Sequence, residues 1–453
     1  MKRSNKHQDM QRITLNNLVG GINISDAPER IPDTDMQICK NFIYDNLRLR
    51  SRGGLSTVSF NMAGSITSMY YDVDTNSSLI FLADGSIYSW IVGKTPTNIG
   101  VLTGNKKPCC AKYMNKIWIA SGGKLQYYDF NSIYTVLSSP DCDITFQRLS
   151  RLLITLSGSD RAYFSAIGDP TNWENITDSS QGAVDSSAQW IDIGYGDSGD
   201  IQSVVPLAND LVFLKSNGNI YQLQGDRTPS SWVVPPAIVT NSDSMGTMTA
   251  TNIGADVVFI SRRGLKSLST VMDYGNVKAQ DIGDKFRSLL TEDMWEPQMI
   301  NMKRHGFLMI RTTSDRTKWT CYNYLMGVAT TIQFAVPVTD IMETVDEVYV
   351  ASGANIFLWD KDNMDDNGKP IEYVLKPHDI LSSDEMLVKA VDTKMTNDEA
   401  GTVEVSTSNL KVEMPTNARR KVLCNHSTDC ISLTLKGTDP FTFDHIVLDV
   451  VDL

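Results

Sequence analysis

The sequence predicts an all-β protein: a six- or seven-bladed β-propeller with an N-terminal arm and a C-terminal antiparallel β extension. Two observations along the chain of 453 residues support this fold class. A short apolar hairpin recurs at intervals, and only one segment has the pattern of a helix. With eight Trp, 16 Tyr and 14 Phe the chain also has ample material for a packed core, which excludes a disordered protein.

The recurring unit is a short apolar strand, a tight turn containing Gly, Asn, Asp or Ser, and a second apolar or aromatic strand. This order is typical of a β-hairpin, because Gly and Asn tolerate the positive φ of a tight turn. The clear copies cover residues 79–90, 117–127, 211–221, 257–265 and 348–359, and the weaker copies cover 152–156 and 307–310.

The spacing of these hairpins indicates a propeller. Their first strands end at Leu82, Ile119, Ile154, Leu214, Ile260, Ile310 and Val350, so that successive ends lie 35 to 60 residues apart. Repeats of roughly 40–50 residues built from short strands are typical of propellers, with one four-stranded blade per repeat. A single hairpin cannot bury both of its faces, so the blades must pack on one another around an axis. One or two β-sandwiches are the alternative, since their turns also recur.

Two segments depart from the repeat. Residues 168–200 form an insertion rich in Ser, Gly and Asp, which predicts a surface loop and a candidate for contacts. Residues 281–290 begin with acids and carry apolar residues three and four positions apart, which predicts a short helix.

Charge and composition divide the chain into three parts: an arm over residues 1–55, a propeller over 56–365, and a C-terminal β domain or set of propeller-closing strands over 366–453. The arm carries nine basic and six acidic residues, whereas the whole chain has a net charge of −12. The polar residues 361–370 predict a boundary. Beyond residue 402, apolar and polar residues alternate, which predicts an antiparallel sheet with one wet face.

The composition also excludes several functional classes. A net negative charge argues against a conventional DNA-binding domain, which needs cations to neutralise phosphates. No apolar run approaches the ~20 residues that span a bilayer, so we expect no membrane insertion. Seven scattered cysteines, an odd number, favour folding in a reducing cytoplasm over a disulfide framework.

Catalytic and metal-binding patterns are missing from the sequence. The five His lie outside any known ligand pattern, and there is no P-loop, dinucleotide fingerprint or nucleophile elbow. Propeller glycosidases use paired carboxylates, but the Asp-rich turns of sialidases do not recur here. Cys424, His426 and Cys430 form at most half of a zinc site, because no second ligand pair follows at finger spacing. We therefore expect no enzyme, no metal and no cofactor.

Two segments carry a resemblance to a known family. The first contains Leu18-Val-Gly20-Gly21-Ile22-Asn23, then Pro32, Cys39-Lys-Asn41 and Asp45-Asn46-Leu47-Arg48-Leu-Arg50-Ser-Arg52-Gly53-Gly54-Leu55. The second is Tyr163-Phe164-Ser165-Ala-Ile-Gly168-Asp169-Pro170-Thr-Asn172-Trp173. Together they resemble the tail nozzle, or packaged-DNA stabilisation, proteins of short-tailed bacteriophages. The resemblance extends over most of the chain, but through short motifs. Asn46 replaces the usual Gly between Asp and Leu-Arg, and it still supports a turn with positive φ.

This resemblance implies a structural protein of the virion tail, synthesised in the host cytoplasm. About six copies are expected to form a ring, the nozzle, below the portal and the head-to-tail adaptor. The ring would extend the DNA channel, retain the packaged genome until ejection and carry tail fibre or tail needle proteins. DNA would pass through the lumen without specific binding, since acidic subunits repel it. The alternative is a monomeric propeller that binds a receptor or a carbohydrate.

An assembly interface is expected at nine residues of these motifs: Gly20, Gly21, Asn23, Arg48, Arg50, Arg52, Asp169, Pro170 and Trp173. The two glycines would form a flexible joint before the arm. The three arginines alternate, so on an extended strand they would form a basic stripe facing an acidic subunit or DNA phosphates. The alternative is that the arginines lie on a solvent-exposed strand edge, where their charge prevents pairing with another strand. Trp173 would either anchor a subunit contact or cover a blade edge.

Overall fold

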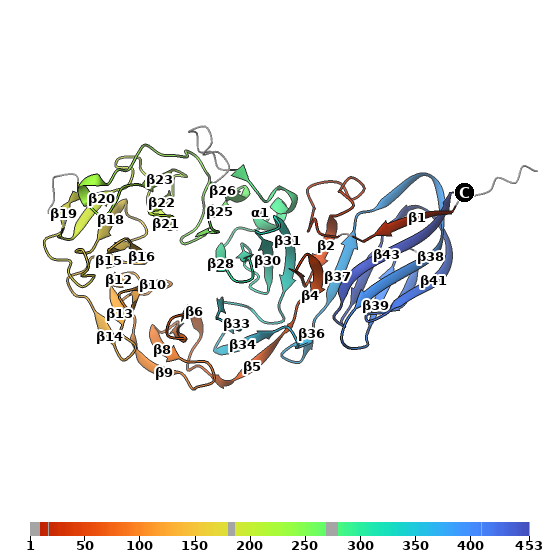
Figure 1. Cartoon of the computed structure of the whole chain (residues 1–453), viewed down its shortest axis with the longest axis horizontal. Coiled ribbons are helices and arrows are strands. Elements are labelled where there is room, and N and C mark those ends of the chain that lie inside the picture. Colours follow the sequence, from red (N-terminus) through yellow and green to blue (C-terminus); the bar gives the residue numbers. More distant parts are fainter. Residues whose placement is uncertain (1–9, 17, 180–185, 269–279, 409, 453) are drawn as a thin grey trace, which may run out of the picture.

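The computed structural model describes residues 10–452 except 17, 180–185, 269–279 and 409. These residues form a ring of β-sheets with a β-sandwich beside it (Figure 1). The prediction of an all-β propeller with a C-terminal antiparallel β extension is confirmed.

Seven sheets of the described chain form the blades, and each runs outward from its first strand. The first and second blades contain β6 (Ile66–Asp72), β7 (Ser77–Leu82), β8 (Ser86–Trp90) and β9 (Thr97–Val101), then β10 (Cys109–Tyr113), β11 (Lys116–Ala120), β13 (Gln126–Tyr128) and β14 (Ile133–Thr135). The third contains β16 (Ile144–Arg148), β17 (Arg151–Thr155), β18 (Arg161–Phe164) and β20 (Gln189–Asp192), with β19 (Thr177–Asp178) at its edge. The fourth contains β21 (Ile201–Leu207), β22 (Asp210–Lys215) and β23 (Ile220–Leu223).

The remaining blades follow the same plan. The fifth contains β24 (Ala250–Asn252), β25 (Val257–Ser261), β26 (Gly264–Ser267) and β27 (Gln280–Asp281). The sixth contains β28 (Gln298–Met302), β29 (Phe307–Arg311), β30 (Lys318–Asn323) and β31 (Val328–Gln333). The seventh contains β32 (Asp340–Glu343), β33 (Val348–Ser352), β34 (Asn355–Asp360) and β5 (Gly54–Asn61). Two short strand pairs accompany the blades: β12 (Gly123–Lys124) with β15 (Asp141–Cys142), and β35 (Asp365–Asp366) with β36 (Lys369–Pro370).

The ring is held together by apolar clusters between neighbouring blades. One cluster joins each adjacent pair, and the cluster around Trp90 and Tyr349 joins the first blade to the seventh. The second strand of each blade therefore has apolar neighbours on both faces. All residues of β7, β17, β25, β29 and β33 are buried. Burial on both faces explains why these strands read as short continuous apolar runs in the sequence.

The seventh blade is closed by a strand from the N-terminal part of the chain. β5 pairs antiparallel with β34, with Leu55 opposite Trp359 and Thr57 opposite Phe357. The first three strands of this blade come from residues 340–360, so ends of the propeller that are far apart in sequence share one sheet. β5 thus covers the edge of β34 and holds the N-terminal part of the chain in the last blade.

The β-sandwich is built from both ends of the chain. One sheet contains β1 (Met10–Leu15), β3 (Phe42–Asp45), β4 (Arg48–Ser51), β38 (Ile380–Thr396), β41 (Arg419–Ile431) and β43 (Thr442–Asp452). The other contains β2 (Met36–Lys40), β37 (Tyr373–Pro377), β39 (Thr402–Ser406), β40 (Lys411–Pro415) and β42 (Thr434–Gly437). One core lies between them, with Leu15, Phe42 and Tyr44 of the first sheet against Tyr373, Val405 and Leu435 of the second.

Propeller and sandwich share a continuous sheet. β2 pairs in parallel with β31 of the sixth blade, where Lys40 lies opposite Thr331. On its other side β2 pairs antiparallel with β37 of the sandwich. The described part of the expected arm thus lies between the two bodies of its own chain and contributes to the core of one of them.

The predicted helix at 281–290 is confirmed in shorter form. A 3₁₀ turn, η4 (Asp284–Phe286), leads into α1 (Arg287–Thr291), and Phe286 and Leu290 are buried. Another 3₁₀ turn, η2 (Pro229–Ser231), follows the fourth blade. No helix among the described residues has the length and apolarity needed to cross a membrane. All seven cysteines are free.

Candidate functional site

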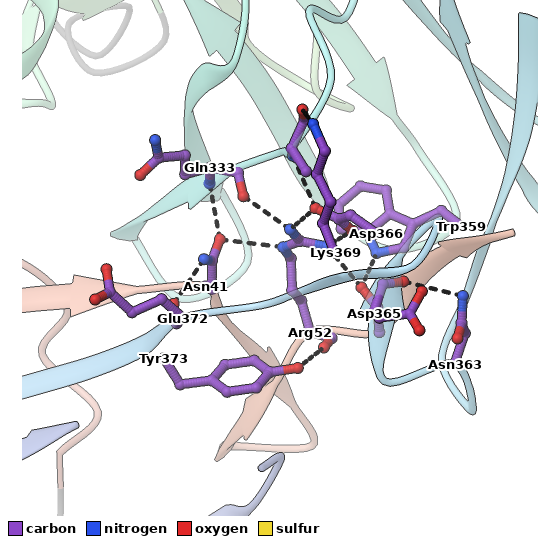
Figure 2. Close-up of polar contacts among 12 residues, drawn as sticks. Asn41, Arg52, Gln333, Trp359, Asn363, Asp365, Asp366, Lys369, Glu372 and Tyr373 are labelled. Carbon is purple, nitrogen blue, oxygen red and sulfur yellow. Dashed lines mark hydrogen bonds and ion pairs between the residues drawn. The ribbon is translucent and has the colours of Figure 1, made fainter. Parts of the chain in front are cut away.

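A buried polar cluster surrounds Arg52, one of the predicted site residues, at the junction of propeller and sandwich. Figure 2 shows the guanidinium of Arg52 between Asn41, Gln333 and Asp366. β4 ends at Ser51 and β5 begins at Gly54, so Arg52 lies in the short connection that joins the sandwich to the closing strand of the propeller.

Every N–H group of the Arg52 guanidinium has a partner. Nε donates to Asn41 Oδ1 at 3.1 Å; Nη1 donates to Gly53 O and Asp366 Oδ1, both at 2.8 Å. Nη2 donates to Gln333 O at 2.8 Å and to Asp366 Oδ2 at 2.6 Å. The ion pair with Asp366 is bidentate, the geometry that matches a guanidinium to a carboxylate. Arg52 is 1% exposed and Asp366 2% exposed, so water competes little for this pair.

The partners of Arg52 come from distant parts of the chain. Asp366 belongs to β35, in the polar stretch predicted as a boundary, and it also accepts a bond from Ala335 N at 2.9 Å. Asn41 follows β2, and its Nδ2 donates to Glu372 O at 2.8 Å. The backbone carbonyl of Arg52 accepts a bond from the Tyr373 hydroxyl at 3.1 Å. One side chain thus links the sixth blade, the closing strand and the sandwich.

The two glycines after Arg52 allow this close approach. A Cβ atom at Gly53 would lie 2.0 Å from Asp360 O, and one at Gly54 would lie 1.9 Å from Asp365 O. In both cases the nearest atom belongs to the backbone, which cannot move aside as a flexible side chain could. The Arg-Gly-Gly part of the motif is therefore required by packing within the chain.

A second ion cluster lies beside this junction. Glu372 accepts hydrogen bonds from Lys40 Nζ and from Lys436 Nζ, both at 2.7 Å. Bonding to these two ammonium groups lowers the pKa of Glu372 from 4.5 to about 2. Because the folded pKa lies below the unfolded one, the stabilisation is present above about pH 4.5 and is lost as the pH falls towards 2.

Replacing Glu372 with Gln is expected to lower the free energy of unfolding by up to about 1 kcal/mol at pH 7, since partial exposure of the carboxylate screens the pairs. The difference from wild type should shrink at pH 3. Urea unfolding at the two pH values measures this, with Glu174→Gln at an exposed position as the control. A difference that stays constant between pH 7 and pH 3 would show that the lysine pairs do not cause it.

The three arginines do not form the predicted exposed stripe. Arg48 is exposed on β4, and Arg50 is half-buried and lies 3.6 Å from Asp45. Arg52 lies past the end of the strand and turns into the junction. The alternation therefore holds for Arg48 and Arg50 only, and the expectation for Arg52 is wrong, because a buried carboxylate pairs with it.

The predicted flexible joint at Gly20-Gly21 is also wrong. Gly20 N donates to Thr34 O at 2.8 Å, and Gly21 N donates to the Tyr44 hydroxyl at 3.1 Å. A Cβ at Gly20 would meet Asp35 Oδ1 at 1.8 Å, and Gly21 has φ +72°, so tight packing and a left-handed conformation require both glycines.

Asn23 anchors the same segment to the propeller. Its Nδ2 donates to Asp35 Oδ2 at 3.1 Å, and that carboxylate accepts a bond from Lys285 Nζ of η4 at 2.8 Å. Ile24 N donates to Lys285 O at 2.8 Å. Since Asn23 and Asp35 are buried, their contacts are made within the chain.

The second motif closes a loop of the third blade. Trp173 is buried in the core between the second and third blades, and its Nε1 donates to Pro170 O at 2.9 Å. Pro170 is buried as well, whereas Asp169 is exposed and its carboxylate accepts a bond from Thr171 N at 3.1 Å. Of the two readings of Trp173, the structure supports the one in which it covers a blade.

Cys424, His426 and Cys430 lie along β41, and no group of metal-ligating side chains is found in the described part of the chain. The junction itself offers saturated hydrogen bonds and no free nucleophile or base, so it positions domains and has no evident reaction chemistry. Sequence reasoning named Asn41 only as part of the first motif and Asp366 only as part of the boundary stretch, and it predicted no contact of either with Arg52. Asp366 gave no further signal, because a polar residue in a turn-rich stretch is usually exposed.

Comparisons with known proteins assign no family to the chain. No family model matches the chain, and no curated protein matches it. Solved structures that are similar include a streptogramin B lyase (TM-score 0.46, 13% identity, covering 67% of this chain and 95% of that one). A second is YCF48 bound to D1 peptide (TM-score 0.45, 9% identity, covering 69% of this chain and 98% of that one). A third is BamB from Moraxella catarrhalis (TM-score 0.43, 11% identity, covering 71% of this chain and 94% of that one).

Proposed function

We propose that this chain is a non-catalytic structural subunit of a bacteriophage tail, which assembles with further copies into a ring at the end of the DNA channel. The ring joins the portal and adaptor above it, retains packaged DNA, lets it pass on ejection, and carries tail fibre or needle proteins. The observation that carries this proposal is the Arg52 junction. It fixes a propeller and a sandwich in one body, as a subunit that bears load within a particle requires.

The contact between copies is assigned to the edge of the sandwich. β41 is 13 residues long and pairs with one strand, β38, among the described strands. An unpaired edge of this length is a template for pairing with another chain. Leu423 lies on this strand and is 76% exposed, so its side chain is available to a strand that pairs with this edge. The proposed occupant is a second copy of this chain.

Light scattering of the purified full chain, alone and mixed with the portal complex, tests the function. A ring, or a monomer that joins the portal complex, is the expected result. A monomer that ignores the portal would contradict the proposal and favour a receptor- or carbohydrate-binding propeller.

Replacing Leu423 with Lys is expected to abolish self-association or reduce it at least tenfold, because a charge is placed on the open edge. Leu325→Lys is the matched control, since Leu325 is also 76% exposed but lies on a turn of the sixth blade. If both variants assemble like wild type, the β41 edge is not the contact. If both fail equally, the effect is one of surface charge and not of position.

A further inference from the structure

A cavity of about 730 Å³ lies at the mouth of the propeller axis. Its lining includes residues at or just before the first strands of five different blades: Ile66, Cys109, Met248, Gln298 and Thr339. First strands of five blades can line one cavity only where they converge, at the centre of the ring in Figure 1. The volume falls within the range of small-molecule sites.

The charges around this cavity do not balance. Lys107, Arg311 and Arg316 line it. Arg316 lies 3.1 Å from Glu296, and Lys107 lies 3.4 Å from Asp340. The described residues offer no carboxylate within 4.0 Å of Arg311, so one positive charge remains without a counter-charge.

Arg311 is buried like Arg52 but is partnered differently. It is 5% exposed and lies with its guanidinium carbon 5.7 Å from the centre of the Trp319 ring. Nη1 donates to Thr313 O at 3.0 Å and Nη2 to Gln298 Oε1 at 3.2 Å. Nε has no partner among the described residues. A buried charge with unfilled donors is costly, so such an arrangement points to a ligand that is bound in the working protein.

Both carboxylates near this network are already engaged: Glu296 pairs with Arg316, and Asp340 is held by other groups. Asp340 Oδ2 accepts a bond from Met69 N at 2.8 Å, and its Oδ1 lies 3.3 Å from Gln298 Nε2. Gln298 therefore separates Arg311 from Asp340: its amide oxygen faces the guanidinium and its amide nitrogen faces the carboxylate. Direct pairing within the chain would displace this amide, which leaves Arg311 available to an external anion.

We propose that the axial cavity binds a small organic carboxylate, with its anionic group on Arg311 and its apolar body against the apolar lining. One uncompensated charge suits a monoanion, and the fork of a guanidinium matches a carboxylate. Ile66, Pro108, Met248 and Met299 supply apolar surface for the remainder of the ligand. This inference does not depend on the proposed role in a phage tail.

Calorimetric titration of the full chain with benzoate tests the proposal, with the neutral isostere benzamide as the comparison. Benzoate is expected to bind saturably at one site per chain and to raise Tm, whereas benzamide should bind at least tenfold more weakly. Arg311→Met is expected to lose at least tenfold in benzoate affinity. Arg263→Met is the matched control, because Arg263 is an exposed arginine paired with Asp243.

The stability of the free variants gives a second measurement that does not depend on the probe. Without ligand, Arg311→Met should have a Tm equal to or above that of wild type, because it removes a buried charge that lacks a counter-charge. A marked loss of Tm, or failure to fold, would mean that Arg311 is a structural residue and would overturn the proposal. Equal binding of benzoate and benzamide, or unchanged binding by Arg311→Met, would overturn it as well.

Discussion

Replacing Arg52 with Met is expected to lower the free energy of unfolding by about 3–5 kcal/mol, because it leaves Asp366 buried without its counter-charge. Asn41 Oδ1 and the carbonyl of Gln333 would each lose a donor in the same step. Urea unfolding followed by circular dichroism measures the loss. Since the junction joins two bodies, the variant is also expected to unfold in two separate transitions.

Two further variants distinguish the ion pair from a general effect of removing an arginine. Arg48→Met on the exposed part of β4 should stay within about 0.5 kcal/mol of wild type. The double variant Arg52→Met with Asp366→Leu should regain part of the loss, because no buried charge is then left unpaired. If Arg48→Met and Arg52→Met lose the same amount, the junction has no special role.

Replacing Trp173 with Ala is expected to lower the free energy of unfolding by about 3–5 kcal/mol, because it opens a cavity in the core between the second and third blades. Thermal unfolding followed by circular dichroism measures this. Trp173→Phe should lose less, since part of the ring volume is kept.

The exposed Ile167 in the same loop supplies the matched control. Ile167→Ala should change stability by no more than about 0.5 kcal/mol. A Trp173→Ala protein with wild-type stability that fails to assemble would show instead that Trp173 anchors a subunit contact.

The propeller was predictable because its second strands are buried on both faces. Each of the seven strand ends named from the sequence, from Leu82 to Val350, lies in the second strand of a blade. The first strands were missed because they are less uniformly apolar; β28, for example, contains Gln298 and Asn301 among its five residues. The long strands β38 and β41 were missed for a similar reason, since charged residues interrupt them.

The sequence by itself determined the repeat, the short helix and the absence of a disulfide framework, because each depends on residues that are close together in the chain or on simple counts. Only the tertiary structure decided that the N-terminal segment joins the C-terminal strands, and that Arg52 is buried while Arg48 is exposed. Arg52 and Asp366 are 314 positions apart, and the residues around one of them give no indication that it pairs with the other. The burial of Arg52 is tolerated because Asp366 pairs with it, and this pair forms only when the ring and the sandwich fold together.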